Sequence, residues 1–182
     1  MHQEVTELGG STLTIDQLVR QHGARVYRMV ASLLGPGASD ADVQDIAQDV
    51  FLGAHRALPR FRGDAKVETW LYGIATRTVL MHLRSWRRRR RLKQAVEAEP
   101  IVDRSPDVER TVAERAELMR VWRCLMQIPA KKRVVYVLYE VEGLSGKEVA
   151  EALDINEATV RTRLYHARKE LMALYEKMGG QR

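Results

Sequence analysis

Apolar residues recur at helical spacing through most of this chain, and the pattern is clearest from residue 144 to residue 171. Ser145 and Glu148 stand three residues apart, as in a capping box, and predict the start of a helix. The inner face of that helix is expected to consist of Val149, Ala150 and Leu153. Asp154 follows where a tight turn needs a left-handed backbone, which Asp tolerates better than most residues. The pattern therefore predicts a short helix followed by a turn.

A second helix is predicted after the turn, with one apolar and one polar side. Asn156 is its expected N-cap. One stripe is apolar, consisting of Val160, Leu164, Ala167, Leu171 and Leu174. The opposite side is polar, consisting of Arg161, Thr162, Arg163, Tyr165, His166, Arg168 and Lys169. Such a pair of helices is typical of a helix-turn-helix, which presents donors to base edges and phosphates. An amphipathic helix in an ordinary bundle gives the same local pattern, so both interpretations stay open.

Two more helices are predicted in the N-terminal part. The first begins at Thr14, which forms a possible capping box with Gln17, and ends at Gly35. Residues before about 12 are expected to form a loose tail. The second runs from residue 39 or 40 to just before Pro59. Its buried stripe is expected to consist of Val43, Ile46, Ala47, Val50, Phe51, Ala54 and Leu58.

Carboxylate and amide side chains dominate the polar faces of that second helix. They are Asp42, Gln44, Asp45, Gln48 and Asp49, and no Lys or Arg occurs from residue 35 to residue 55. The helix dipole accounts for acids in the first turn, such as Asp40 and Asp42. It does not account for Asp45 and Asp49, which lie beyond that turn. A basic protein partner would explain the pattern, although a merely solvated face is the alternative.

The positive charge of the chain is concentrated between residues 56 and 93. Twelve Lys and Arg residues oppose only Asp64 and Glu68 there, a local net charge of +10 (12 minus 2). A helix core face is expected from Val67, Trp70, Leu71, Ile74, Ala75 and Thr78, with Met81 or His82 as its next member. A basic, Gly-containing loop over residues 61–66 would precede it. Cations beside aromatic rings are typical of sites for unpaired nucleic acid.

Simpler explanations exist for parts of this basic segment. Trp70 and Tyr72 would serve equally well in core packing, which is the favoured interpretation for Trp70. The run Arg87–Arg91 would suit a helix C-terminus, but five successive arginines exceed that need and favour phosphate contact.

The C-terminal half begins after a change in composition. Residues 94–112 contain two prolines and several acids with weak periodicity, and are predicted to be a linker. A helix from Ala113 to Pro129 follows. The segment KKRVVYVLYEVEG is rich in β-branched residues, as in a strand, but its apolar positions also fit a helix closed by Gly143, which is the interpretation preferred here. This helix would complete a four-helix domain with the helix-turn-helix.

The composition of the chain limits the classes of protein and of partner that the sequence allows. An apolar fraction of 45% is that of a soluble globular protein, and a net charge of +6 suggests a polyanionic partner. One cysteine, Cys124, excludes an internal disulfide, and no histidine has a second ligand at metal spacing, so neither a metal nor a cofactor is expected. No signal peptide or long apolar stretch is present, which predicts a cytoplasmic protein.

Two quoted stretches together resemble a known family. They are DIAQDVFLGAHRALPRFRGDAKVETWLYGIATRTVLMHLRS and CLMQIPAKKRVVYVLYEVEGLSGKEVAEALDINEATVRTRLYHARKEL. Over roughly residues 12–175 the chain closely resembles the extracytoplasmic-function (ECF) sigma factors of bacterial RNA polymerase. The resemblance implies an all-α fold with sigma region 2 at 12–93, a linker at 94–112 and sigma region 4 at 113–178. It implies core polymerase, promoter DNA and an anti-sigma factor, often membrane-bound, as partners, and no enzymatic activity or small-molecule substrate.

The resemblance also assigns site residues. Those expected to bind core polymerase are Asp45, Gln48, Asp49, Phe51 and Leu52. Those expected to bind and melt the minus-ten element lie between Phe61 and Arg84 and include Phe61, Arg62, Gly63, Asp64, Lys66, Trp70, Arg77 and Arg84. Those expected to read the minus-thirty-five element are Arg161, Thr162, Tyr165 and His166, with Arg168 on a phosphate. The sequence departs from the family pattern at Arg77, Met81, Asp154 and His166, where Asn, Asp, Gly and Arg are usual.

Two other functions fit part of the pattern. A free-standing regulator would bind duplex DNA through the helix-turn-helix alone, but would leave the acidic helix and the basic loop unexplained. A nuclease or deaminase would need clustered metal ligands or an acid–base pair, which the sequence does not supply.

Overall fold

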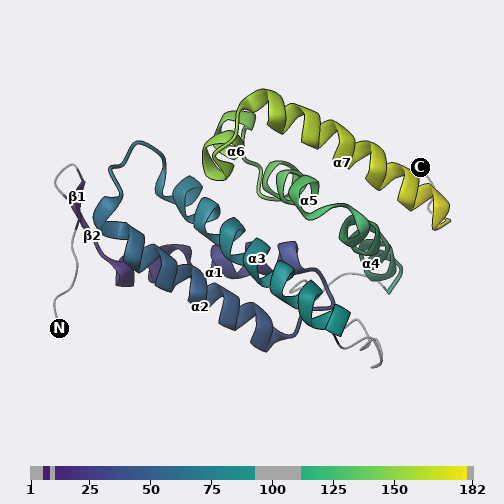
Figure 1. The fold of residues 1–182 in the computed structure, drawn as a ribbon, viewed down its shortest axis with the longest axis horizontal. Coiled ribbons are helices and arrows are strands. Elements are labelled where there is room, and N and C mark those ends of the chain that lie inside the picture. The colour runs from purple at the N-terminus through teal and green to yellow at the C-terminus, as the bar shows by residue number, and fades with distance from the viewer. Residues whose placement is uncertain (1–5, 9–10, 93–111, 180–182) are drawn as a thin grey trace.

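The computed structural model describes residues 6–8, 11–92 and 112–179, and helices dominate it (Figure 1). The N-terminal group comprises α1 (Ile15–Leu34), α2 (Asp40–Ala57), a 3₁₀ turn η1 (Leu58–Arg60) and α3 (Val67–Leu92). The C-terminal group comprises α4 (Val112–Gln127), α5 (Ala130–Tyr136), a π-helical turn η2 (Val137–Val141), α6 (Gly146–Leu153) and α7 (Glu157–Lys177). The predicted all-α fold is confirmed. The predicted linker lies outside the described residues, except for Val112, where α4 begins.

A short β-hairpin precedes α1, so the expectation of a loose tail before residue 12 is wrong. Strands β1 (Thr6–Leu8) and β2 (Ser11–Leu13) pair antiparallel, with Thr6 opposite Leu13. Strands of three residues are too short to show an alternating pattern, and their backbone pairing leaves no trace in the sequence.

The predicted helix starts are confirmed where the capping signals were strongest. Thr14 with Gln17, Ser39 with Asp42, and Ser145 with Glu148 each form a capping box. In the helix-turn-helix, the side chain of Asn156 accepts a hydrogen bond of 2.7 Å from the backbone of Thr159. Asp154 adopts a left-handed conformation, with φ of 52° and ψ of 53°, as the turn requires.

The ambiguous segment 131–143 is helical, as predicted. Val134, Val135, Val137 and Leu138 are each at most 2% exposed. Helix α5 packs against α7 and contacts α4, and η2 contacts α6. Burial in a helix bundle therefore outweighs the strand preference of β-branched residues. The π-helical turn then ends the helix and is closed by hydrogen bonds from the backbone of Glu142 and Leu144.

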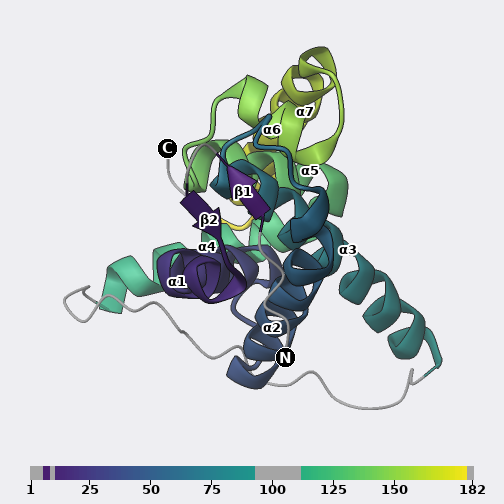
Figure 2. The same cartoon turned by 90° about the vertical axis from the view of Figure 1, so that its left-hand side faces the viewer.

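Helix α3 is the member of the N-terminal group that packs most extensively against the C-terminal group (Figures 1 and 2). On one side it packs on α1 and α2, and on another it packs on α6. Leu71, Ile74, Ala75 and Val79 form its core contacts, as expected for the first three. Of the two residues expected to continue this core face, Met81 is 60% exposed and His82 is partly buried, and Val79 occupies the core at that turn.

Candidate functional site

The five residues predicted to bind polymerase lie on α2, and we call them the α2 acidic face: Asp45, Gln48, Asp49, Phe51 and Leu52. All are exposed except the half-buried Phe51. Leu52 is 45% exposed, so an apolar side chain stands beside the two carboxylates. His82 on α3 lies 2.9 Å from the carboxylate of Asp49 and holds it against the helix pair. The result is an acidic surface with an apolar centre, which suits a basic protein partner.

The loop between η1 and α3, residues 61–66, presents charge but not its aromatic ring. Arg62, Gly63, Asp64 and Lys66 are exposed, and Arg62 donates a hydrogen bond of 3.0 Å to Asp64. Gly63 has φ of 76°, a conformation that favours glycine. The two basic residues further along α3, Arg77 and Arg84, are both exposed.

Phe61 and Trp70 form a packed aromatic pair at the base of this loop. Phe61 is 7% exposed, and its ring centroid lies 4.6 Å from that of the partly buried Trp70. Core packing, favoured for Trp70 from the sequence, therefore accounts for both rings in this conformation. Tyr72 is buried as well, at 2% exposure. The side chains of the Arg87–Arg91 run lie outside the described residues.

Helix α7 presents its polar side to solvent. Arg161, Thr162, Tyr165, His166 and Arg168 are all exposed. The Thr162 hydroxyl donates to the carbonyl of Ala158 on the preceding turn. Val160, predicted to face the core, is 1% exposed. The second helix of the motif therefore has the buried and exposed sides that the sequence predicted.

Arg168 differs from the other polar residues of α7 because it is already engaged. Its Nε donates to Glu140 at 2.7 Å, and its guanidinium lies 5.6 Å from the centroid of the Tyr139 ring. Arg161, by contrast, lies 3.9 Å from Glu157, a loose contact at the protein surface. Of the two arginines, Arg161 has the freer side chain for a base edge.

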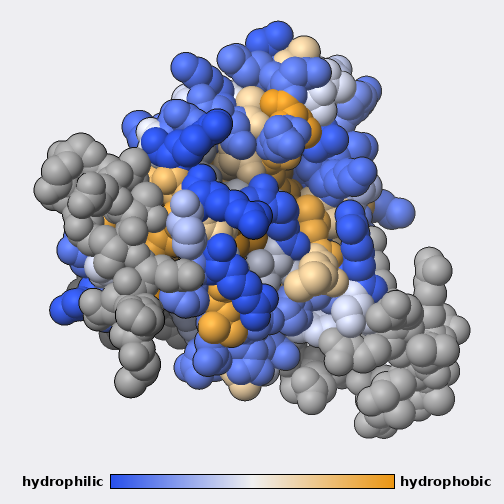
Figure 3. Space-filling model, turned by 60° about the vertical axis from the view of Figure 1, so that its left-hand side comes forward, coloured by the Kyte–Doolittle hydropathy of each residue, from blue (hydrophilic) through white to orange (hydrophobic). Residues whose placement is uncertain are grey.

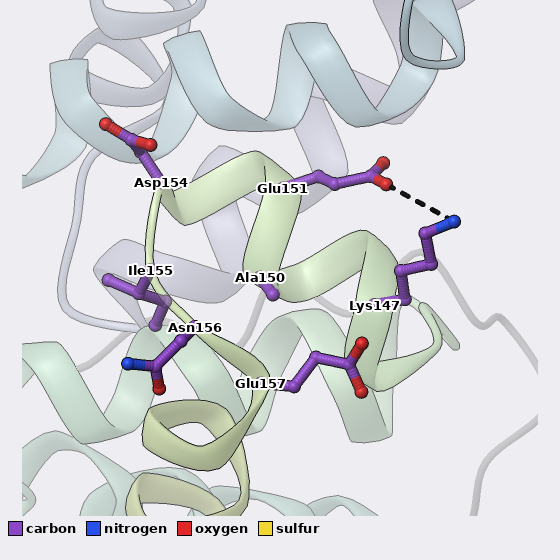
Figure 4. Close-up of a pocket in the computed structure, with 7 residues that line it drawn as sticks. All are labelled: Lys147, Ala150, Glu151, Asp154, Ile155, Asn156 and Glu157. Atoms are coloured by element: carbon purple, nitrogen blue, oxygen red, sulfur yellow. Dashed lines mark ion pairs between the residues drawn. The ribbon is translucent and has the colours of Figure 1, made fainter.

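An open groove of about 560 Å³ lies where α6 meets α7 (Figure 4). It is lined by Lys147, Ala150, Glu151, Asp154, Ile155, Asn156 and Glu157. The one lysine of this lining, Lys147, lies 4.0 Å from Glu151. The other two carboxylates of the lining belong to Asp154 and Glu157. Three carboxylates would repel phosphates, so this groove is a poor seat for DNA.

The sequence did not indicate the ion pair between Lys66 and Glu148, whose charged atoms lie 2.7 Å apart. Glu148 was expected only to cap α6, which it also does. The hydrogen bond from Lys66, followed by those from Ser145, lowers the pKa of Glu148 to about 2, and Glu148 in turn raises the pKa of Lys66. No local signal reveals this pair, because its members are 82 residues apart.

Two further features concern the described residues, 6–8, 11–92 and 112–179. None of their helices is both long and apolar enough to cross a membrane. Nor do they bring together three His, Cys, Asp or Glu side chains that could hold a metal ion.

Family models match both helical groups. Residues 18–90 match Sigma-70 region 2, and residues 118–171 match Sigma-70 region 4. The fold and the helix-turn-helix therefore define a protein of the sigma-70 class.

Sequence identity to individual relatives shows to which family within the sigma-70 class the chain belongs. The chain is 34% identical to the ECF RNA polymerase sigma factor SigM of Mycobacterium tuberculosis over 170 residues, which covers 92% of this chain and 80% of the relative. It is also 34% identical to the ECF RNA polymerase sigma-E factor of Escherichia coli K12 over 154 residues, 81% of each. The chain belongs to the ECF sigma factors of RNA polymerase.

Two solved structures share its fold. CnrH, in complex with the cytosolic domain of CnrY, aligns with a TM-score of 0.61 at 28% identity, covering 90% of this chain and 88% of CnrH. RpoE of Bartonella quintana, in complex with the anti-sigma factor NepR, aligns with a TM-score of 0.70 at 19% identity, covering 88% and 96%.

Proposed function

We propose that this chain is an alternative sigma factor that binds core RNA polymerase, directs it to particular promoters and promotes strand opening. The observation that carries the proposal is the separation of charge over three surfaces. The α2 acidic face would bind the polymerase, the basic loop before α3 would hold the minus-ten element, and α7 would read the minus-thirty-five element. Family membership supports all three assignments.

The domain boundaries follow from the same proposal. Region 2 would comprise residues 12–93 and region 4 residues 113–178, with a linker at 94–112. Strand opening needs no catalytic group, only binding energy that favours unpaired bases, so the chain would act without enzymatic activity of its own. It would work in the cytoplasm, where promoter DNA and polymerase are found.

An anti-sigma factor is proposed as a further partner. CnrH and RpoE of B. quintana were both solved with such a protein or a partner domain bound.

The decisive experiment is run-off transcription with purified core polymerase and a library of genomic fragments. We expect transcripts from a small set of promoters that share two sequence elements. If no template yields a transcript while core polymerase is active with another sigma factor, the proposal fails. Binding to duplex DNA without any effect on polymerase would instead identify a free-standing regulator.

Polymerase binding through α2 can be tested by a matched pair of charge reversals. Asp45 and Asp16 are both exposed acids on helices of the same domain. Asp45→Lys should strongly reduce co-purification with core polymerase, whereas Asp16→Lys should not. Equal binding of the two variants, with unchanged helical circular dichroism, would remove the α2 assignment.

A further inference from the structure

One hydrogen bond connects the α2 acidic face to helix α3. Nε2 of His82 lies 2.9 Å from Oδ2 of Asp49, although the two residues are 33 positions apart in the sequence. Because an ionised carboxylate only accepts hydrogen bonds, His82 is the donor, through its Nε2–H. The side chain of Asp49 is 46% exposed, whereas that of His82 is 25% exposed. The bond therefore joins a carboxylate that a partner could reach to a ring that lies mostly within the helix pair.

The imidazole ring of His82 is held in place by its surroundings. Its centroid lies 6.5 Å from that of the Trp86 ring, in an edge-to-face arrangement, and Trp86 packs against the core. Helices α2 and α3 also approach closely one turn after Asp49. A Cβ atom added at Gly53 would lie 3.2 Å from Cγ2 of Ile74 on α3, which is tighter than an ordinary contact. Because the ring and the spacing of the helices are both fixed, His82 can restrain the carboxylate that it binds.

The two carboxylates of the α2 acidic face differ in this respect. Asp45 lies one turn before Asp49 and is exposed, and it has no hydrogen bond or ion pair with another side chain among the described residues. A partner that binds such a side chain must first restrict its rotation, which costs conformational entropy. The carboxylate of Asp49 is already oriented by His82 and still has Oδ1 for a partner. Asp49 is therefore the carboxylate of this face that is prepared for a directed contact.

Exposed apolar side chains by themselves do not distinguish the α2 acidic face from the rest of the surface. Leu52 is exposed, but Val19 on α1 and Met172 on α7 are exposed to a similar extent. Hydrophobic patches also lie between hydrophilic residues on the face that Figure 3 shows. Scattered apolar exposure is normal in proteins and needs no partner to explain it. The oriented carboxylate is therefore the more specific feature of α2.

A histidine suits this position better than a permanently charged donor. A neutral imidazole donates one hydrogen bond and adds no positive charge, so Asp45 and Asp49 would both keep their attraction for a basic partner. A lysine or arginine at position 82 would orient Asp49 equally well, but its charge would offset that of the carboxylate. The pair of His82 and Asp49 therefore combines a fixed geometry with a surface that stays acidic.

We propose that His82 is a positioning residue for the binding of core RNA polymerase. Its hydrogen bond holds the carboxylate of Asp49 in the orientation that meets a cation of the polymerase, and His82 acts only through Asp49. This inference rests on the proposed function, because it concerns the same α2 acidic face. It adds a residue of α3 to a surface whose other members all lie on α2.

Substitutions of His82 test this role through the affinity of the full chain for core RNA polymerase, measured by competition with an N-terminally labelled wild-type chain. His82→Leu removes the donor but keeps a side chain of similar size, and should weaken binding several-fold. His82→Gln places an amide N–H close to the position of Nε2 and should restore most of the affinity. His22→Leu is the control, because His22 is a partly buried histidine of α1 that lies 4.0 Å from Glu68, and should bind like wild type. Equal affinities of His82→Leu and wild type would overturn the proposal.

A double-mutant cycle distinguishes positioning from a general effect on the fold. If His82 acts through Asp49, His82→Leu should weaken binding no further in a chain that carries Asp49→Ala, but should keep its full effect in a chain that carries Asp45→Ala. An equal effect in both chains would overturn the proposal. The single variants separate this result from the proposed function. If Asp45→Ala and Asp49→Ala both bind like wild type, the assignment of α2 to polymerase fails and this inference fails with it. If Asp49→Ala binds weakly and His82→Leu binds like wild type, only the role of His82 fails.

Discussion

The two surfaces proposed to bind DNA are presented in opposite ways. On α7 the side chains expected to read the upstream element face solvent, and Tyr165 is 62% exposed. In region 2 the loop before α3 has Lys66 paired with Glu148, and Phe61 is buried against Trp70. On the proposed assignments, region 4 would bind duplex DNA without rearrangement, whereas Lys66 and Phe61 of region 2 would first have to leave their present partners. This difference would suit the proposed tasks, because duplex binding needs a preformed surface and strand opening needs groups that become available to unpaired bases.

The largest effect is expected from a core substitution that destabilises the fold of region 4 and leaves the fold of region 2 intact. Leu138 is fully buried in the core of region 4. Leu138→Ala should destabilise that region by about 2–5 kcal/mol because it leaves a cavity. Binding to upstream duplex should be lost while binding to core polymerase through α2 remains. Co-purification and DNA-binding assays on the same preparation check this, and joint loss of both activities would show that the regions fold as one unit.

A smaller effect is expected on the exposed surface of α7. Arg161→Ala should weaken binding to the upstream element by about 1–3 kcal/mol and relax its sequence preference, if the guanidinium contacts a base edge in bidentate fashion. Arg123→Ala removes the same charge from an exposed position on α4 and serves as the control. Titration of wild-type and mismatched duplexes measures both variants. Uniform weakening across all sequences would indicate a phosphate contact instead.

The stability of region 4 should depend on how readily residue 154, in the turn of the helix-turn-helix, adopts a left-handed backbone. Asp154 is the one non-glycine residue with positive φ in the part of the chain that the structure describes. Asp154→Gly should stabilise region 4 by about 0.5–1 kcal/mol, because glycine adopts the left-handed conformation without steric cost. Asp154→Ala should destabilise it. Urea denaturation of the three proteins gives the order, and a less stable glycine variant would contradict the explanation.

The smallest effect concerns the ion pair that distinguishes the two DNA surfaces. The pKa of Glu148 is about 2 in the folded chain against an ordinary value of 4.5, so its stabilising contribution is complete above pH 4.5 and is lost as pH falls towards 2. Glu148→Gln removes the charge but keeps the capping box, because Gln also serves at that position. Wild type should lose slightly more stability than the variant over this range, since solvent screens a pair whose lysine is largely exposed. Urea denaturation at several pH values measures the free energy of unfolding of both proteins. If it changes with pH in the same way in wild type and in Glu148→Gln, the pair contributes nothing to stability.

Local signals in the sequence predicted most of the helices. Ser145, Glu148 and Asn156 act within one turn of their own position, and Asp154 marks a backbone conformation that few residues tolerate. The apolar stripe that includes Val160 has the helical period. Such features depend on neighbours in the sequence, so they could be recognised without knowledge of the fold.

Contacts between distant residues could not be predicted in this way. The Lys66–Glu148 and Tyr72–Glu142 contacts require α6 and η2 to lie beside α3. Helical spacing allowed either Met81 or His82 to continue the core face, and the packing partners of α3 decide which position at that turn is buried. The assignments of Asp45, Asp49 and Arg161 to polymerase and DNA stay predictions.

The π-helical turn η2, which follows α5, and the residue after it contact both α7 and α3. Glu140 within it pairs with Arg168 on α7, and Glu142 just after it accepts the hydrogen bond from Tyr72 on α3. A π turn holds one residue more than the α-helical turn it replaces. Removing that residue would rotate one side of the turn by about 100° relative to the other, and the two carboxylates could no longer serve both neighbours. A single-residue deletion between positions 137 and 141 would therefore break the contacts of this turn with α7 or with α3 without altering any residue on either helix.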